Sequence, residues 1–244
     1  MVMIIVMIPR KIHYCWYGDQ PPSDLIKKCM ESWQIAMPDY QIKRWDVSNS
    51  PLDHSYAREA YVRRQWSALS NYIRLHALRT EGGIYLDTDI ETLKSLTPLL
   101  DDHCFLGFQQ ELKQQDWVNT AVLGAEPGHS FLAACMHRLE GSFRNTGRFE
   151  RSPLLTTAIL RKSGLNRYGL QTVNDVTIYP VEYFYPFSWL EKYSPDRITT
   201  QTYCVHYWTA TWKTSRSLEW PVPIKRFKRA VLTWVQRQAD KSSR

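Results

Sequence analysis

Residues 82–91 constrain the fold of this chain more than any other stretch. Two glycines open it and end a preceding helical pattern, because glycine accepts the left-handed backbone found at many helix ends. Residues 84–86 are then typical of a short buried strand that leads into Asp87 and Asp89. Side chains alternate along a strand, so these two carboxylates should face the same side with Cα atoms about 6–7 Å apart. Such a pair can share one divalent cation, which also binds phosphates.

An Asp-x-Asp pair alone is common by chance, and a polar strand exit explains it equally well. A longer pattern precedes it here, with Ser70-Asn71-Tyr72-Ile73-Arg74-Leu75, Ala77-Leu78 and Glu81 upstream of the glycines. This composite motif resembles the sugar-binding region of family 32 glycosyltransferases and of related glucosylating bacterial toxins. In that family the region holds a metal-bound nucleotide-sugar in a fold called GT-A.

Composition sets the size and the class of the protein. The chain has 244 residues, 43% of them hydrophobic, which is enough for one sizeable α/β domain. Its five cysteines are dispersed, which favours reduced thiols in the cytoplasm over a disulfide framework. Residues 1–8 are apolar but too few to span a bilayer, and they lack a basic flank, so we expect no signal peptide.

Positive charge is concentrated at the end of the chain. The net charge is +7, and residues 221–244 hold seven Lys/Arg and one Asp, or +6, which leaves +1 for residues 1–220. We therefore expect a catalytic domain over residues 1–220 that does not bind nucleic acid, followed by a basic tail. Apolar residues recur in the tail at three- and four-residue spacing, which is typical of an amphipathic helix on an anionic membrane surface. A final helix packed on the domain is the alternative.

Strand and helix patterns alternate along the domain. The first strand region is expected over residues 4–17, with an interruption at 9–11, and further strands at 40–45, 84–86, 105–108 and 121–125. A helix is expected at 23–33 and a long helical region at 56–80. This alternation favours an α/β fold. The resemblance implies a single GT-A-like, Rossmann-like domain, with a mixed, mostly parallel sheet flanked by helices.

The nucleotide is expected where the first two strands end, because open α/β sheets bind ligands at the carboxyl ends of their strands. Residues 9–18 resemble the opening motif of the family, in which a tryptophan packs on the base, and this assigns Trp16 to stacking. Core packing of an aromatic strand end is the alternative. Asn49 follows the second strand and can bond the nucleoside or close a turn.

The donor sugar is assigned to the helix before the glycines. Ser70, Asn71 and Arg74 lie within one helical turn, and Asn71 and Arg74 share a face. The resemblance implies that this face contacts the sugar or its phosphates, and it places Tyr85 in the same substrate-binding set. The family usually has Asp where this chain has Asn71. The amide keeps an acceptor oxygen, gains a donor and loses the charge, which bears on sugar identity.

Metal binding and catalysis draw on two further segments. Residues 203–213 resemble a Trp-flanked segment of the family, which makes His206 a metal ligand beside Asp89 and Asp87, and places Trp212 over the diphosphate. A structural histidine is the alternative. Residues 119–132 resemble the acceptor side of the family, where an amide near the anomeric carbon gives Asn119 a catalytic role. An ordinary asparagine at a strand start fits the sequence as well.

Together these resemblances imply a retaining hexosyltransferase that requires Mn²⁺ or Mg²⁺. The donor is a nucleotide diphosphate sugar, with UDP favoured over GDP. The acceptor is a saccharide hydroxyl, on a lipid-linked oligosaccharide, in surface polysaccharide synthesis. The tail places the enzyme peripherally on the cytoplasmic face of the membrane. The alternatives are an inactive transferase-like scaffold, marked by Asn71, and an Asp-x-Asp-x-Thr phosphatase, whose motif Glu91 breaks.

Overall fold

A computed structural model describes residues 7–17, 20–191 and 193–209. Trp212 and the predicted tail, residues 221–244, lie outside the described residues. The division of the chain at residue 220 therefore stays a prediction.

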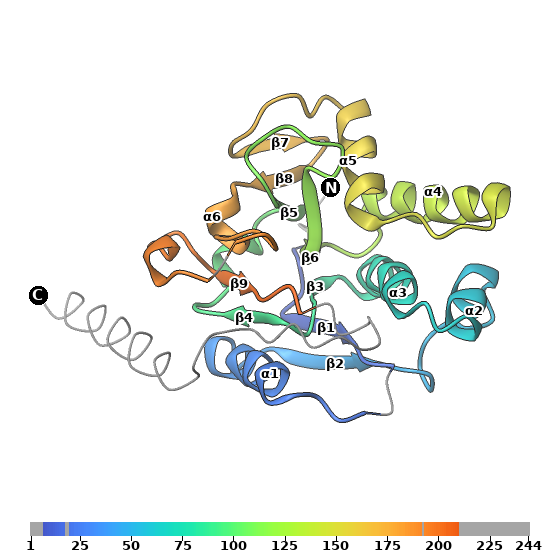
Figure 1. Ribbon diagram of the computed structural model, residues 1–244, viewed down its shortest axis with the longest axis horizontal. Coiled ribbons are helices and arrows are strands. Elements are labelled where there is room, and N and C mark those ends of the chain that lie inside the picture. The colour runs from blue at the N-terminus through green and yellow to red at the C-terminus, as the bar shows by residue number, and fades with distance from the viewer. Residues whose placement is uncertain (1–6, 18–19, 192, 210–244) are drawn as a thin grey trace, which may run out of the picture.

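A seven-stranded sheet forms the centre of the molecule, in the order β2-β1-β3-β6-β5-β8-β7 (Figure 1). β1 pairs in parallel with β2 and β3, and β5 pairs in parallel with β8, whereas β6 and β7 run antiparallel to their neighbours. Five strands thus run in one direction and two oppose them, so the predicted mixed, mostly parallel sheet is confirmed. The strands are β1 Lys11–Cys15, β2 Gln41–Trp45, β3 Gly83–Leu86, β5 Cys104–Phe108, β6 Val118–Ala125, β7 Gln171–Val173 and β8 Val176–Tyr179.

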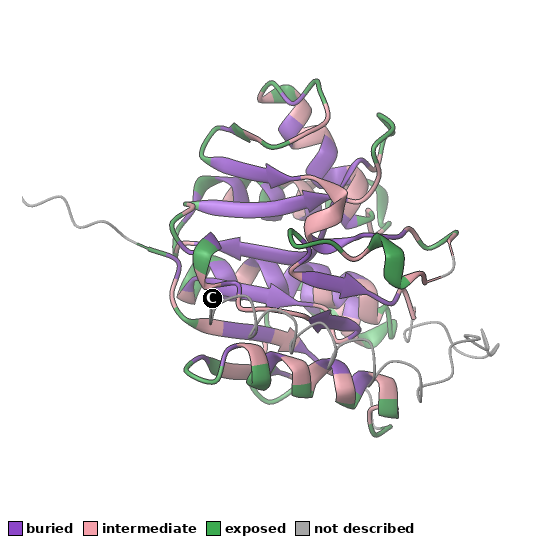
Figure 2. Ribbon diagram, turned by 90° about the vertical axis from the view of Figure 1, so that its left-hand side faces the viewer, coloured by how far each residue is buried: buried purple, intermediate pink, exposed green. Residues whose placement is uncertain are grey.

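Helices cover both faces of the sheet (Figure 1). α2, α3, α4 and α5 pack over one hydrophobic core, and α1 and α6 pack over a second core on the other face. The strands between them are largely buried (Figure 2). Their bounds are α1 Asp24–Ala36, α2 Ser55–Val62, α3 Trp66–Glu81, α4 Ser130–Thr146, α5 Ser152–Lys162 and α6 Val181–Phe184, with 3-10 turns at Thr97–Leu99 and Pro195–Arg197. Within the described ranges, no helix is both long enough and apolar enough to cross a membrane.

The predicted single helix over residues 56–80 is wrong, because the structure divides it into α2 and α3. The chain turns after α2 at Arg64, whose φ of 54° lies in the left-handed region. The turn lets the buried Tyr56 ring stack on Tyr72 of α3 at 5.4 Å between centroids. No glycine or proline marks this break, so tertiary packing decides it.

A separate two-stranded ribbon joins distant parts of the chain. β4, Ile90–Thr92, pairs antiparallel with β9, Cys204–His206, and sets Ile90 opposite His206. Trp33 of α1 supports the ribbon by donating its indole N–H to the carbonyl of Ile90 at 2.7 Å. This ribbon was not predicted, and it brings the Asp-x-Asp motif next to the C-terminal histidine.

Candidate active site

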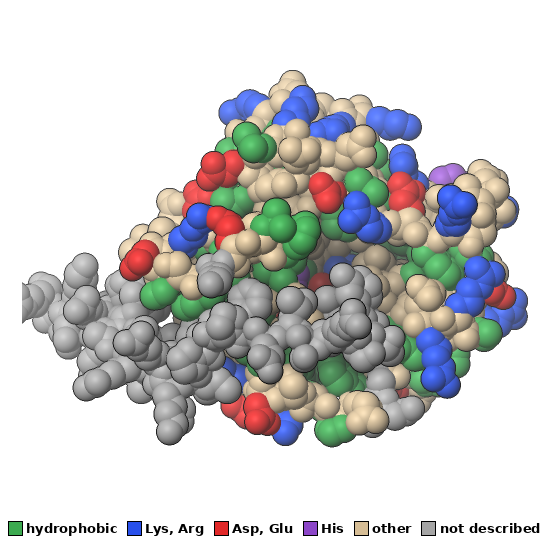
Figure 3. Space-filling model, in the orientation of Figure 1, with side chains coloured by type: hydrophobic (Ala, Val, Ile, Leu, Met, Phe, Trp, Pro, Cys, Tyr) green, Lys and Arg blue, Asp and Glu red, His purple; other side chains and the backbone are tan. Residues whose placement is uncertain are grey.

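The carboxyl ends of the parallel strands gather at one edge of the sheet, which Figure 3 shows face-on with a hollow near its middle. Trp16 follows β1, Asp87 follows β3 and Gln109 follows β5 at this edge. Open α/β sheets bind ligands at this edge.

The two motif carboxylates lie in a turn rather than in a strand. β3 ends at Leu86, and the Ile90 N–H donates to the Asp87 carbonyl at 2.9 Å to close the turn into β4. Strand alternation was expected to align Asp87 and Asp89, but this reason is wrong because both residues lie beyond the end of β3. The turn places the two carboxylates one residue apart, and the charge of Asp89 adds to the rise in the pKa of Asp87 that burial causes.

Asp87 is held by two buried side chains from the face of the sheet that α3 covers. Its Oδ1 accepts hydrogen bonds from Arg74 Nη2 at 2.9 Å and from the Tyr85 hydroxyl at 3.1 Å. The Arg74 guanidinium lies 4.5 Å above the Tyr85 ring and donates from Nη1 to the carbonyl and hydroxyl of Thr120. Burial raises the pKa of Asp87, and Arg74 opposes that rise. In this structure Arg74 and Tyr85 orient Asp87; their predicted contact with substrate stays a prediction.

Asp89 is fixed by the chain that follows β9. Its Oδ2 accepts hydrogen bonds from the backbone N–H of Thr209 at 2.8 Å and from the Thr209 hydroxyl at 3.0 Å. Its Oδ1 lies 3.2 Å from His206 Nε2. Burial alone would raise the pKa of Asp89, but His206 and Thr209 outweigh it and lower the pKa to about 2. Asp89 is therefore a carboxylate at neutral pH.

His206 is oriented by aromatic neighbours. Its ring lies 3.9 Å from Trp208 and 5.8 Å from Tyr185, between centroids. Nε2 faces Asp89, while the buried Nδ1 has no hydrogen-bond partner in the part of the chain that the structure describes. The arrangement presents a carboxylate oxygen and a ring nitrogen side by side.

Comparison with known proteins shows which family the chain belongs to. Residues 23–106 match the family described as the glycosyltransferase sugar-binding region containing the DXD motif, and residues 124–220 match the alpha 1,4-glycosyltransferase conserved region. The chain belongs to the DXD-containing glycosyltransferases. The family resemblance inferred from the sequence is thus confirmed.

Two relatives show the range of similarity to this glycosyltransferase. Lactosylceramide 4-alpha-galactosyltransferase of Mus musculus is 33% identical over 166 residues, which cover 64% of this chain and 44% of that protein. Inositol phosphoceramide mannosyltransferase 1 of Schizosaccharomyces pombe is 30% identical over 148 residues, 54% of this chain and 43% of that protein. The chain thus spans less than half the length of either relative. Among solved structures, PaToxG Glycosyltransferase is 16% identical, with a TM-score of 0.49 over 64% of this chain and 69% of that chain.

The residues of this glycosyltransferase fit a divalent cation that is shared with a ligand. Two adjacent ligands of an octahedral cation, each about 2.1 Å from it, lie about 3 Å apart, which the spacing of Asp89 Oδ1 and His206 Nε2 matches. Among the described residues, no group of three or more His, Cys, Asp or Glu side chains could hold an ion. Magnesium-type sites commonly combine one or two carboxylates with substrate phosphates. That Asp87 is a further ligand of the cation stays a prediction. Its Oδ1 accepts from Arg74 and Tyr85, so Oδ2 is the oxygen that could bind the cation.

Asn71 is the predicted sugar contact with the most available polar group. Its residue surface is only 8% exposed, and its amide makes no hydrogen bond to another described residue. None of the fully buried, unpaired polar atoms among the described residues belongs to Asn71, so its amide reaches the surface, where a ligand can bind it. Ser70, one residue earlier, uses its backbone carbonyl to accept from Arg74 Nε at 3.4 Å.

Asn119 lies within β6 rather than before a strand, and its amide is engaged at both ends. Oδ1 accepts from the Ala121 N–H at 2.8 Å, and Nδ2 donates to Gln109 Oε1 at 2.8 Å. The predicted catalytic role of Asn119 stays untested. Gln109 was missed by sequence reasoning, although its place directly after β5 was an available signal. Thr209 was also missed, because nothing in the sequence links it to Asp89.

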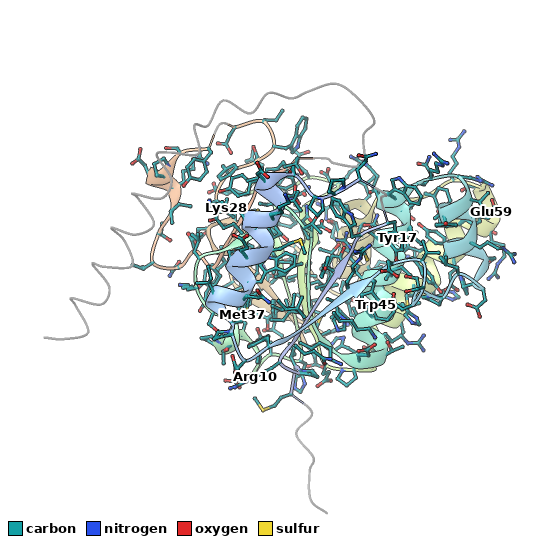
Figure 4. All side chains as sticks on the ribbon, turned by 90° about the horizontal axis from the view of Figure 1, so that it is seen from below. Arg10, Tyr17, Lys28, Met37, Trp45 and Glu59 are labelled. Carbon is teal, nitrogen blue, oxygen red and sulfur yellow. The ribbon has the colours of Figure 1, made fainter. Side chains whose placement is uncertain are left out.

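The nucleotide-side residues lie at the ends of β1 and β2, near Tyr17 and Trp45 in Figure 4. Trp16 donates its indole N–H to the Gln20 carbonyl at 3.3 Å, and its ring is partly exposed. Asn49 accepts from the Asp46 N–H at 2.9 Å and donates to the Arg44 carbonyl at 2.8 Å. The amide of Asn49 therefore closes a turn, which is the second of the two roles expected for it, the first being a hydrogen bond to the nucleoside.

Proposed function

We propose that this protein transfers a hexose from a nucleotide diphosphate sugar to a hydroxyl acceptor with the help of Mn²⁺ or Mg²⁺. The observation that carries the proposal is the pairing of Asp89 Oδ1 with His206 Nε2 at 3.2 Å inside a DXD sugar-binding region. A cation held by this pair would neutralise the charge that develops on the departing diphosphate.

The side chains around the pair divide the remaining tasks. Arg74 and Tyr85 fix Asp87 beside the sugar, and Asn71 offers its free amide to the sugar hydroxyls. Trp16 packs on the base at the end of β1, and the assignment of Trp212 to the diphosphate stays a prediction from the sequence. The reaction retains the anomeric configuration, in keeping with the family 32 resemblance, and Asn119 lies toward the acceptor.

The named relatives guide the choice of donor and acceptor. The mouse protein is named for galactosyl transfer to lactosylceramide, and the fission yeast protein for mannosyl transfer to inositol phosphoceramide. Both names describe glycolipids, which supports a lipid-linked saccharide as acceptor here. UDP-galactose is the first donor to test and GDP-mannose the second. We further propose that the enzyme acts in surface polysaccharide synthesis and binds peripherally to the cytoplasmic face of the membrane.

The structure disfavours the phosphatase alternative. The fifth position of an Asp-x-Asp-x-Thr motif, where threonine is required, is Glu91 in this chain, and it is buried in the β4–β9 ribbon. Its carboxylate pairs with Lys28 at 3.0 Å and accepts a hydrogen bond from Tyr207. Glu91 therefore joins α1 to the ribbon.

A thermal-shift screen tests the proposed function. The full chain is heated with UDP-galactose, UDP-glucose or GDP-mannose, each in Mn²⁺ and in EDTA. A ligand at 100 times its Kd stabilises the folded state by about 2.7 kcal/mol, so the correct donor should raise the melting temperature only with the metal. The absence of metal-dependent stabilisation by any nucleotide-sugar would contradict the proposal.

A further inference from the structure

The two oxygens of the Asp89 carboxylate have different surroundings. Oδ2 accepts two hydrogen bonds from one residue, the backbone N–H and the hydroxyl of Thr209, at 2.8 and 3.0 Å. A carboxylate offers about four lone-pair sites on two oxygens, so these two bonds fill Oδ2. Within the described part of the chain, Oδ1 has only His206 Nε2 beside it, at 3.2 Å. The protein therefore leaves one oxygen of this carboxylate for a cation.

The backbone of Trp208 delivers Thr209 to this position. Trp208 has a φ of 54°, in the left-handed region, two residues after β9 ends at His206. Such a conformation is unfavourable for a bulky residue and persists only where surrounding contacts impose it. Those contacts are the indole N–H, which donates to the Phe187 carbonyl at 3.0 Å, and the ring, which lies on His206. One turn thus orients both His206 and Asp89.

Thr209 does more than hold β9 against β4. The backbone already makes that connection, through the Tyr207 N–H to the Asp89 carbonyl at 3.0 Å and the pairing of Ile90 with His206. The two bonds from Thr209 are additional and act on the carboxylate alone. Their effect is to set which of its oxygens stays open.

We propose that Thr209 is a positioning residue that determines which cation the site accepts. By filling Oδ2 it restricts Asp89 to a one-oxygen contact beside a ring nitrogen. This contact suits small octahedral ions such as Mn²⁺ and Mg²⁺, whereas Ca²⁺ takes six to eight oxygen ligands and often a carboxylate through both oxygens. The inference rests on the proposed function, because it requires a cation at this site.

The test measures cation binding rather than turnover. The full chain and its variants are titrated with Mn²⁺ and with Ca²⁺ in the presence of UDP, by calorimetry and by melting temperature. Thr209→Val and Thr209→Ala remove the hydroxyl, and Thr209→Ser restores it. Thr80→Val is the matched control, since the Thr80 hydroxyl donates to backbone carbonyls of its own helix.

Removing the hydroxyl should raise the half-saturating Mn²⁺ concentration about tenfold, the lower end of typical losses when a residue that orients a metal ligand is removed. Half-saturation by Ca²⁺ should change less, so the preference for Mn²⁺ falls, and Thr209→Ser should recover it. An unchanged preference in a folded Thr209→Val or Thr209→Ala variant would overturn the role of Thr209 and leave the proposed function standing. If the unaltered protein binds UDP equally with and without a cation, the proposed function fails, and the inference fails with it.

Discussion

Asp87 and Asp89 are equivalent in the sequence motif, but the protein holds them by different means. Asp87 depends on the Arg74–Tyr85 pair, and burial raises its pKa. Asp89 depends on Thr209 and His206, which lower its pKa to about 2. Asp89 is therefore the more firmly charged of the two carboxylates, which favours it as the cation ligand in the proposed function.

Asn71 provides a prediction about sugar choice. The residue is only 8% exposed, and its amide reaches the surface without a hydrogen bond to another described residue, so we expect the donor to supply its partners. Asn71→Asp replaces two N–H donors with an acceptor and a charge, and we expect at least a tenfold change in relative rates across a panel of nucleotide-sugars, because unpaired polar contacts cost about 1–3 kcal/mol. Asn145→Asp on the exposed face of α4 is the control. Identical donor preference in the two variants would remove residue 71 from the sugar site.

At the scale of elements, the junction of α3 and β3 depends on a glycine. Gly83 has a φ of 109°, and a Cβ there would lie 2.6 Å from the Lys11 carbonyl oxygen of β1. Gly83→Ala should lower the free energy of unfolding by at least about 1–3 kcal/mol, the usual cost of a strained backbone. Gly141→Ala is the matched control, because its Cβ meets nothing within 4 Å, and it should add about 0.5–1 kcal/mol as a helix substitution. Equal unfolding midpoints in urea would contradict this account of the junction.

The buried His13 should make the stability of the folded protein depend on pH. It is fully buried on β1, where Nε2 donates to the Gly82 carbonyl at 2.9 Å and Nδ1 accepts from the Trp45 indole at 3.0 Å. Burial lowers the pKa of His13 to about 4 from its usual 6.5. The unfolded chain therefore takes up a proton first, and stability present above pH 6.5 is lost as the pH falls toward 4.

As the pH falls from 7 to 5, the His13 imidazole alone should lower the free energy of unfolding by about 2 kcal/mol. His13→Gln should be less stable than the unaltered protein at pH 7, but its stability should fall less over that interval. Urea unfolding of both proteins at the two pH values measures the difference. Parallel losses in both proteins would show that His13 does not govern this pH range.

Local sequence was sufficient to predict the elements that carry the motif but not the contacts that complete the site. The strands at β1, β2, β3 and β5 and the helix α1 follow from residue periodicity. The division of α2 from α3 depends on ring packing between Tyr56 and Tyr72. The β4–β9 ribbon pairs residues more than 100 positions apart, so no local pattern encodes it. The role of Thr209 follows from that ribbon and was hidden for the same reason.

At the scale of the whole molecule, we expect the basic tail, residues 221–244, to attach the protein to anionic membranes. Each cation near an anionic surface contributes about 1 kcal/mol, so the four at the start of the tail should support reversible binding. Replacing Lys225, Arg226, Lys228 and Arg229 with Gln should abolish sedimentation with anionic liposomes, and high salt should do the same to the unaltered chain. The control variant carries Gln at four exposed positions of the domain, Arg58, Arg148, Lys162 and Arg167. Equal sedimentation of the two variants would make the tail an ordinary packed or solvated helix.

The central claim is that Asp89 binds a cation on which use of the donor depends. The most direct measurement is donor hydrolysis and transfer by Asp89→Asn, with the unaltered chain in Mn²⁺ and in EDTA alongside it. The amide keeps the shape of the side chain and can still accept from Thr209, so the variant should fold with an unchanged circular dichroism spectrum. We expect the unaltered chain to turn over its nucleotide-sugar in Mn²⁺, and both EDTA and Asp89→Asn to reduce the rate by at least about 100-fold, as loss of a principal electrostatic contact does. Full turnover in EDTA, or by a folded Asp89→Asn variant, would contradict the claim.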